Sequence, residues 1–169
     1  MLSDTPSSVA EGDAIVDAVL TASRVLVAVA ARSLGDIAEE VTLTQYRTLV
    51  VLASRGPQSL AELAVAVAVT PPTATRMCDR LVKKGLVLRR HDRGDRRLIR
   101  LTLAKRGRDL VDEVTHRRRT EIVELVRAVP KDQRAAMVDS LQRLSAAAGE
   151  VPEQDWSAGW GFETGGTLP

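Results

Sequence analysis

The charged stretch HDRGDRR, residues 91–97, lies between two apolar segments, GLVLRR and LIRLTL. It holds three arginines and two aspartates around Gly94. Guanidinium groups donate several hydrogen bonds in a fixed fork that matches phosphate oxygens, so this composition suits contact with a polyanion. A solvated turn is the simpler interpretation of the same residues. The choice between the two depends on where the loop lies in the fold.

The positive charge of the chain is concentrated around this loop. Residues 76–108 hold 13 of the 24 Lys and Arg residues and only three acidic residues, so this window carries +10 although the whole chain carries +2. A basic block inside a folded segment favours an anionic partner over a merely solvated surface.

Other kinds of chemistry find little support. A lone cysteine, Cys78, excludes an intramolecular disulfide and a Cys-rich metal site, and its apolar helical surroundings favour packing over redox sensing. His91 and His116 lack the spacing of zinc ligands. The sequence shows no phosphate loop, no nucleophile elbow and no carboxylates clustered with a histidine. We therefore expect no enzyme activity, no metal and no cofactor.

The composition is that of a globular chain with an aliphatic core. Of the 169 residues, 44% are hydrophobic but only 2% are aromatic. This length predicts one domain, or one domain plus an appendage. We also expect no apolar run long enough to span a bilayer and no signal peptide in MLSDTPSSVAEGD, and hence a cytoplasmic protein without membrane contact.

Capping patterns divide the chain into helices around one hairpin. Thr42 with Gln45 and Ser59 with Glu62 are capping boxes, and Pro130 must end a helix. The predicted helices cover residues 13–34, 42–55, 60–68, 71–84, 104–129 and 131–149, and the predicted strands cover residues 86–91 and 97–103, with DRGD as the turn.

The short helix, the tight turn at residues 67–69 and the next capped helix form a helix-turn-helix, and the basic hairpin makes it a winged helix. This arrangement resembles the MarR (multiple antibiotic resistance regulator) family of bacterial transcription factors. The resemblance covers residues 14–148 and rests on LTQYRTLVVLASRGPQSLAELA, VTPPTATRMCDRLVKKGLVLRR and DRGDRRLIRLTLAKRG. The last segment is the most specific, because the family's wing reads D-x-x-D-R-R, then a strand and Lys/Arg-Gly.

Two positions depart from the family pattern. Ala104 replaces the usual N-cap threonine, so the cap passes to Thr102 or the helix frays. Ala68 replaces the usual glycine of the helix-turn-helix turn, which requires the backbone there to avoid a left-handed conformation.

The predicted fold class is therefore mainly α with a small β-hairpin wing: a winged helix-turn-helix with N- and C-terminal dimerisation helices. We assign residues 1–12 to a flexible N-terminus, 13–149 to a MarR-like domain and 150–169 to an irregular tail. Within the domain, residues 42–103 form the winged helix, and residues 13–34 and 104–148 form the dimerisation helices.

The outward face of the predicted recognition helix, about residues 70–84, supplies the candidates for DNA contact, because such helices read the major groove with their N-terminal residues. Arg76 suits a bidentate contact to guanine, and an ion pair with Asp79 is the alternative. The resemblance implies that one arginine of the wing, residues 92–97, enters the minor groove while Asp95 orients a neighbour. The DNA-binding candidates are Thr70, Pro72, Thr73, Arg76, Arg80, Arg93, Arg96 and Arg97.

We predict a transcriptional regulator that binds double-stranded DNA, as a homodimeric repressor of a pseudo-palindromic operator. Dimerisation follows from apolar residues on more than one face of the first helix, and the resemblance implies it too. The resemblance also implies a small-molecule effector, of unassigned identity, that releases the DNA. The alternative is a winged-helix module that binds an acidic protein partner.

Overall fold

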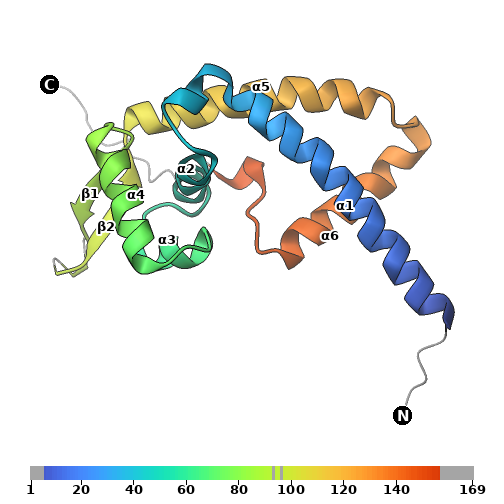
Figure 1. Cartoon of the computed structure of the whole chain (residues 1–169), viewed down its shortest axis with the longest axis horizontal. Helices are drawn as coiled ribbons and strands as arrows, with labels where there is room; N and C mark the ends of the chain where they lie inside the picture. Colours follow the sequence, from blue (N-terminus) through green and yellow to red (C-terminus); the bar gives the residue numbers. More distant parts are fainter. Residues whose placement is uncertain (1–5, 93, 96, 157–169) are drawn as a thin grey trace, which may run out of the picture.

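The computed structural model describes residues 6–92, 94, 95 and 97–156, and it is almost entirely helical apart from one hairpin (Figure 1). The α-helices are α1 (Pro6–Leu34), α2 (Leu43–Arg55), α3 (Leu60–Ala66), α4 (Pro71–Lys83), α5 (Lys105–Arg127) and α6 (Arg134–Ala147). The strands are β1 (Val87–His91) and β2 (Ile99–Leu103), and the short 3-10 helices are η1 (Gly35–Glu39), η2 (Lys131–Gln133) and η3 (Glu153–Asp155).

The helices α2, α3 and α4 and the hairpin form one lobe, which lies at one end of the molecule in Figure 1. The strands pair antiparallel with Val87 opposite Leu103 and His91 opposite Ile99. Gln58, just before α3, exchanges two backbone hydrogen bonds with Leu101 and so joins the middle of β2 to the helix-turn-helix. The predicted winged-helix fold is confirmed.

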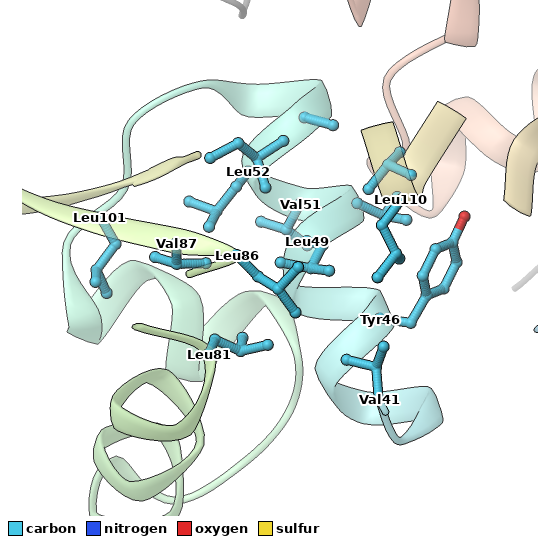
Figure 2. Packing of buried hydrophobic residues seen from close by; sticks show 14 of the residues in the cluster. Val41, Tyr46, Leu49, Val51, Leu52, Leu81, Leu86, Val87, Leu101 and Leu110 are labelled. Atoms are coloured by element: carbon cyan, nitrogen blue, oxygen red, sulfur yellow. The ribbon is translucent and has the colours of Figure 1, made fainter. Parts of the chain in front are cut away.

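An aliphatic core fills this lobe (Figure 2). Leu49, Leu63, Leu81 and Leu86 are completely buried and come from α2, α3, α4 and the segment before β1. Burying a side chain of this size stabilises the fold by roughly 1.5–3 kcal/mol. Leu110 of α5 reaches the same cluster, so α5 is attached to the lobe at its N-terminal end.

The other end of the molecule is a set of long helices that extend from the lobe (Figure 1). The helix α1 runs along α5, where Arg32 Nη2 lies 2.8 Å from Glu121 Oε2. The helix α6 returns beneath them, and none of its residues is buried. These helices therefore leave apolar surface uncovered within the single chain.

Several helix boundaries follow the capping signals. Thr42 and Ser59 are N-caps of α2 and α3, and both capping boxes are complete. Gly35, with φ +45°, ends α1, and α5 ends before Pro130 as predicted. The first helix begins at Pro6 rather than residue 13, because one interior glycine, Gly12, costs only about 1 kcal/mol in a helix of this length.

Ala68 is a correction to the prediction from sequence. We expected its backbone to avoid the left-handed region, yet its φ is +53°. The tight turn between α3 and α4 requires this conformation, since Ala68 N–H donates to Val65 O and Val69 N–H donates to Ala64 O. Tertiary structure thus imposes a backbone conformation that costs an alanine roughly 1–2 kcal/mol.

The start of α5 shows how this helix begins without the family's usual N-cap threonine. Ala104 is the N-cap in an extended conformation, and no side chain caps the helix. Thr102 does not take over, because its Oγ1 is buried and has no hydrogen-bond partner within the described part of the chain. Gly107 explains the Lys/Arg-Gly signature: a Cβ at this position would lie 2.1 Å from Leu86 O.

The alternation along β2 places Leu101 and Leu103 on the buried face. Leu98, in the predicted strand of residues 97–103, lies before β2 instead, in the loop, where its side chain is exposed. The strand therefore begins two residues later than predicted.

We expected no apolar run long enough to span a bilayer. This expectation is wrong, because one helix has the length and the apolar composition to do so. Ala10–Glu39 contains an 18-residue window of mean hydropathy 1.9, and only 6% of that window is buried within this chain. A helix that packs against other protein segments can pass the same test. The exposed apolar surface of α1 therefore needs a partner, whatever that partner is.

The segment after α6 is more closely attached than an irregular tail. Glu150 accepts hydrogen bonds from the Arg47 guanidinium, and Arg55 Nη2 donates to Gly149 O at 3.0 Å. Trp156 packs against the core cluster, and its Nε1 donates to Val151 O. Residues 149–156 thus connect α6 back to α2, while the rest of the predicted tail lies outside the described residues.

Candidate nucleic-acid interface

The helix α4 has one buried face and one exposed face. Ala74, Met77, Cys78 and Leu81 are buried, as the helical spacing predicted. Of the candidate contacts, Thr70, Pro72, Arg76 and Arg80 are exposed and Thr73 is half-buried. The packing of α4 against its own lobe therefore directs the predicted recognition residues outward.

The N-terminus of α4 has a different hydrogen-bonding pattern from the one expected. Thr70 occupies the N-cap position, but its side chain does not cap the backbone. Its Oγ1 instead donates to Thr73 Oγ1 at 3.0 Å, and Arg76 Nη2 donates to the same oxygen at 3.4 Å. Uncapped N–H groups at a helix N-terminus favour a phosphate group, so the arrangement suits contact with DNA backbone as well as bases.

The alternative role of Arg76, an ion pair with Asp79, is not what the structure shows. Asp79 pairs with Arg89 of β1. This ion pair joins α4 to the wing, so Asp79 has a structural partner and Arg76 remains on the exposed surface of the helix.

The wing loop is closed by its aspartates. Asp92 N–H donates to Leu98 O, and Asp95 Oδ1 accepts from the backbone N–H of Arg97 at 2.9 Å. Asp95 and Arg97 are exposed. They follow β1, the strand that lies beside α4. The remaining wing candidates, Arg93 and Arg96, lie outside the described residues. The proposed role of Asp95 in orienting an arginine side chain stays a prediction.

The basic block of residues 76–108 is only partly available to a partner. Arg106 binds Glu40 Oε1 and Lys84 O, each at 2.6 Å, and Lys84 Nζ donates to Glu40 O. Arg89 is paired with Asp79, and Arg100 contacts two carboxylates. The charge count in the sequence therefore overstates the charge offered to DNA, because several of these cations hold the lobe together.

Cys78 is completely buried on the inner face of α4. Burial raises the pKa of its thiol, which disfavours the reactive thiolate. These observations agree with a packing role, and the absence of redox sensing stays a prediction.

An aromatic residue and a cation lie together where the lobe meets α5. Tyr46 is 2% exposed, and the Arg118 guanidinium lies 5.7 Å from its ring centroid. Burial raises the pKa of Tyr46. Trp156 packs against the core cluster that contains Tyr46, so the segment after α6 adds a second aromatic ring to this core.

The sequence analysis missed Glu62 and Arg100 as members of the wing region. Arg100 Nη1 lies 2.6 Å from Glu62 Oε2, although the two residues are 38 positions apart. No spacing rule connects residues at that separation. The available signal was that Arg100 is the one charged residue of β2.

The recognition helix turned outward beside a hairpin wing defines a winged helix-turn-helix DNA-binding protein. The sequence pattern of the MarR family matches residues 41–99, which contain α2, α3, α4 and most of the wing. The chain belongs to the MarR family of transcriptional regulators.

The chain is also similar to individual proteins in sequence and in structure. The chain is 43% identical to RV1404 from Mycobacterium tuberculosis, with a TM-score of 0.76 over 83% of this chain and 96% of that one. It is 29% identical over 106 residues to the HTH-type transcriptional repressor MdtR of Bacillus subtilis (strain 168), covering 63% of this chain and 68% of that protein. It is also 26% identical to BpsR of Bordetella bronchiseptica, with a TM-score of 0.57 over 76% and 91% of the chains.

Proposed function

We propose that this protein is a homodimeric transcriptional repressor that binds a pseudo-palindromic operator through α4 and the wing. The exposed face of α4 carries the proposal: Arg76 and Arg80 lie outward from a helix whose opposite face is buried. Repression is supported by the similarity to MdtR, which is named as a repressor. The function requires a cytoplasmic location, because the operator lies there.

The dimer is supported by exposed apolar side chains on the long helices. On α1 they include Ile15, Leu20 and Val27, which are at least half exposed, and on α6 they include Val138 and Leu144. Removing such surface from water contributes about 25 cal/mol per Å². A two-fold dimer would place two α4 helices about one helical turn of DNA apart, centre to centre.

A small-molecule effector is part of the proposal, with its identity open. The DNA binding of BpsR is regulated by 6-hydroxynicotinic acid, which shows that this kind of control occurs in a similar protein. Tyr46 of the lobe and Arg118 of α5 lie together. A ligand bound beside them could therefore influence both the lobe and α5.

Selection of bound sequences from random duplex DNA tests the function and defines the operator. Arg76→Ala should then weaken operator binding by ~1–3 kcal/mol and relax preference at one base pair per half-site, because the lost contact is to a base edge. Arg97→Ala should weaken binding to all duplexes and flatten the salt dependence by about one unit, because the lost contact is to a phosphate.

Arg127→Ala is the matched control. It removes the same charge from the end of α5 that lies far from the lobe, where Arg127 pairs with Glu124, and measuring its dimer dissociation constant alongside separates any effect on assembly from an effect on DNA contact. If no duplex is enriched, the DNA-binding role fails and the alternative, a module that binds an acidic protein, takes its place. If Arg97→Ala binds all duplexes like the wild type, residues 91–97 are only a solvated turn.

A further inference from the structure

Arg100 connects the wing loop to the first helix of the helix-turn-helix. Its Nε donates to Asp92 Oδ2 at 3.0 Å, and its Nη1 donates to Glu62 Oε2 at 2.6 Å. Asp92 begins the wing loop, and Glu62 lies in the first turn of α3. One guanidinium therefore joins two parts of the lobe that are far apart in the chain.

Both carboxylates are already held by backbone groups. Asp92 Oδ1 accepts from Gly94 N–H at 2.8 Å and from Asp95 N–H at 3.3 Å. Glu62 Oε2 accepts from Ser59 N–H at 2.6 Å, as part of the capping box. These backbone hydrogen bonds, followed by Arg100, lower the pKa of each carboxyl, so both are ionised at neutral pH. The bridge is thus ionic and anchored at both ends.

The hairpin is also attached to the lobe at the middle of its strands, where Arg89 of β1 pairs with Asp79 of α4 and Leu101 of β2 pairs with Gln58 through the backbone. Gln58 and Leu101 exchange hydrogen bonds of 3.0 and 2.7 Å. Beyond this point the strands project, and Leu98 and Ile99 are about half exposed. A two-stranded ribbon has little rigidity by itself. Because Asp92 lies beyond the last strand pair, the Arg100 bridge holds the wing closer to its tip than these attachments do.

We propose that Arg100, with Asp92 and Glu62, is a positioning site that fixes the tilt of the wing so that the wing and α4 contact one duplex together. Partly exposed ion pairs contribute only about 0–1 kcal/mol to stability, so the geometric effect should exceed the effect on folding. Contacts to phosphates set the register of a protein on DNA, so a change of tilt would be felt in affinity. This inference rests on the proposed DNA-binding function.

Glu62→Gln tests the positioning role, because the loss of charge and the loss of positioning change the affinity for DNA in opposite directions. Glutamine at this position still completes a capping box, so mainly the ionic contact is lost. Removing a negative charge should by itself strengthen binding to a polyanion. The positioning role instead predicts operator binding weakened roughly three- to tenfold, with the salt dependence flattened by about one unit per lost wing contact. Asp92→Asn, which keeps an oxygen for Gly94 N–H, should have the same effect.

Two controls accompany these variants. Glu150→Gln makes the same charge change in the ion pair with Arg47 of α2, outside both the candidate DNA contacts and the dimerisation helices, and its affinity should equal that of the wild type. In an Arg100→Gln background, Glu62→Gln should produce no further loss, because a residue that acts through Arg100 is coupled to it. Thermal unfolding of each variant, followed by circular dichroism, separates loss of fold from loss of binding.

The outcomes are distinct. If the wild type binds and folded Glu62→Gln and Asp92→Asn bind as tightly or more tightly, the positioning role is wrong while the DNA-binding function stands. If their losses are equally large in the Arg100→Gln background, the acids act independently of Arg100 and the inference also fails. If the wild type binds no duplex, the proposed function fails, and this inference with it.

Discussion

The helices α4 and α6 have nearly the same length, 13 and 14 residues, but they relate to their own chain in opposite ways. The inner face of α4 is completely covered by the lobe, whereas α6 has no buried residue and exposes its apolar side chains, Met137, Val138, Leu141 and Leu144, by 38–53%. An amphipathic helix stabilises a fold only where its apolar face is covered. The winged-helix lobe is therefore complete within one chain, and the long helices are not.

This difference separates two kinds of surface that look alike in the sequence. The exposed face of α4 is polar and basic, and it can remain in water until DNA binds. The exposed faces of α1 and α6 are aliphatic, and leaving them in water is unfavourable. A second copy of the chain is the partner that the proposed function supplies.

The largest expected effect comes from placing a charge on the aliphatic surface. Leu20 of α1 is 54% exposed in the single chain. Leu20→Glu should raise the dimer dissociation constant by roughly 100-fold or more, because burying an unpaired carboxylate costs several kcal/mol. Sedimentation equilibrium at micromolar concentration should then show 18.3 kDa monomers that keep a folded winged-helix lobe.

Val65→Glu is the control for this variant. Val65 is 83% exposed on α3, in the complete lobe, and its replacement should leave the assembly state unchanged. Either of two outcomes would contradict the difference between the lobe and the long helices. A dimeric Leu20→Glu protein would show that α1 is not the interface, and a fully unfolded one would show that the lobe depends on the long helices.

A second effect, on folding rather than assembly, is expected at Gly107. A Cβ there would lie 2.1 Å from Leu86 O and 3.2 Å from Leu103 Cδ2, and the first of these atoms is backbone that cannot rotate away. Gly107→Ala should therefore lower the free energy of unfolding by ~3 kcal/mol. Urea denaturation measures this change in the free energy of unfolding.

Gly12→Ala is the matched change in the long helices. A Cβ at Gly12 meets nothing within 4 Å, so the added methyl should raise helix stability by roughly 0.5–1 kcal/mol. Equal and small effects of the two substitutions would contradict the close approach of α5 to the segment before β1.

Local signals in the sequence predicted most of the fold. The boxes at Thr42 and Ser59 gave the starts of α2 and α3, because capping depends only on residues three apart. The inner face of α4 followed from helical periodicity, and Gly35 and Pro130 marked helix ends. These features are determined by neighbours in the chain, which is why they can be predicted without tertiary structure.

The features that were not predicted depend on residues distant in the sequence. An ion pair between Asp79 and Arg76 was the alternative to a base contact by Arg76, but Arg89 of β1 is the partner of Asp79. The contacts of Arg100 with Glu62 and of Arg47 with Glu150 join elements that meet only in the folded chain. The candidate site could therefore be located from sequence, but the division of its charges between DNA contact and internal support could not.

The smallest expected effect concerns the turn between α3 and α4, where the complete lobe still contains strain. Ala68 has φ +53°, which costs roughly 1–2 kcal/mol for a residue with a Cβ. Ala68→Gly removes this strain but adds freedom to the unfolded chain, which offsets roughly 0.4–1 kcal/mol of the gain. The net result should be an increase of roughly 0.5–1 kcal/mol in the free energy of unfolding, measured by urea denaturation.

Ala61→Gly, at an exposed position in the first turn of α3, should instead decrease the free energy of unfolding by roughly 0.5 kcal/mol. Opposite signs at two alanines seven residues apart would show that the turn, rather than the residue type, stores the strain. If both substitutions destabilise the protein, the left-handed conformation at Ala68 is contradicted.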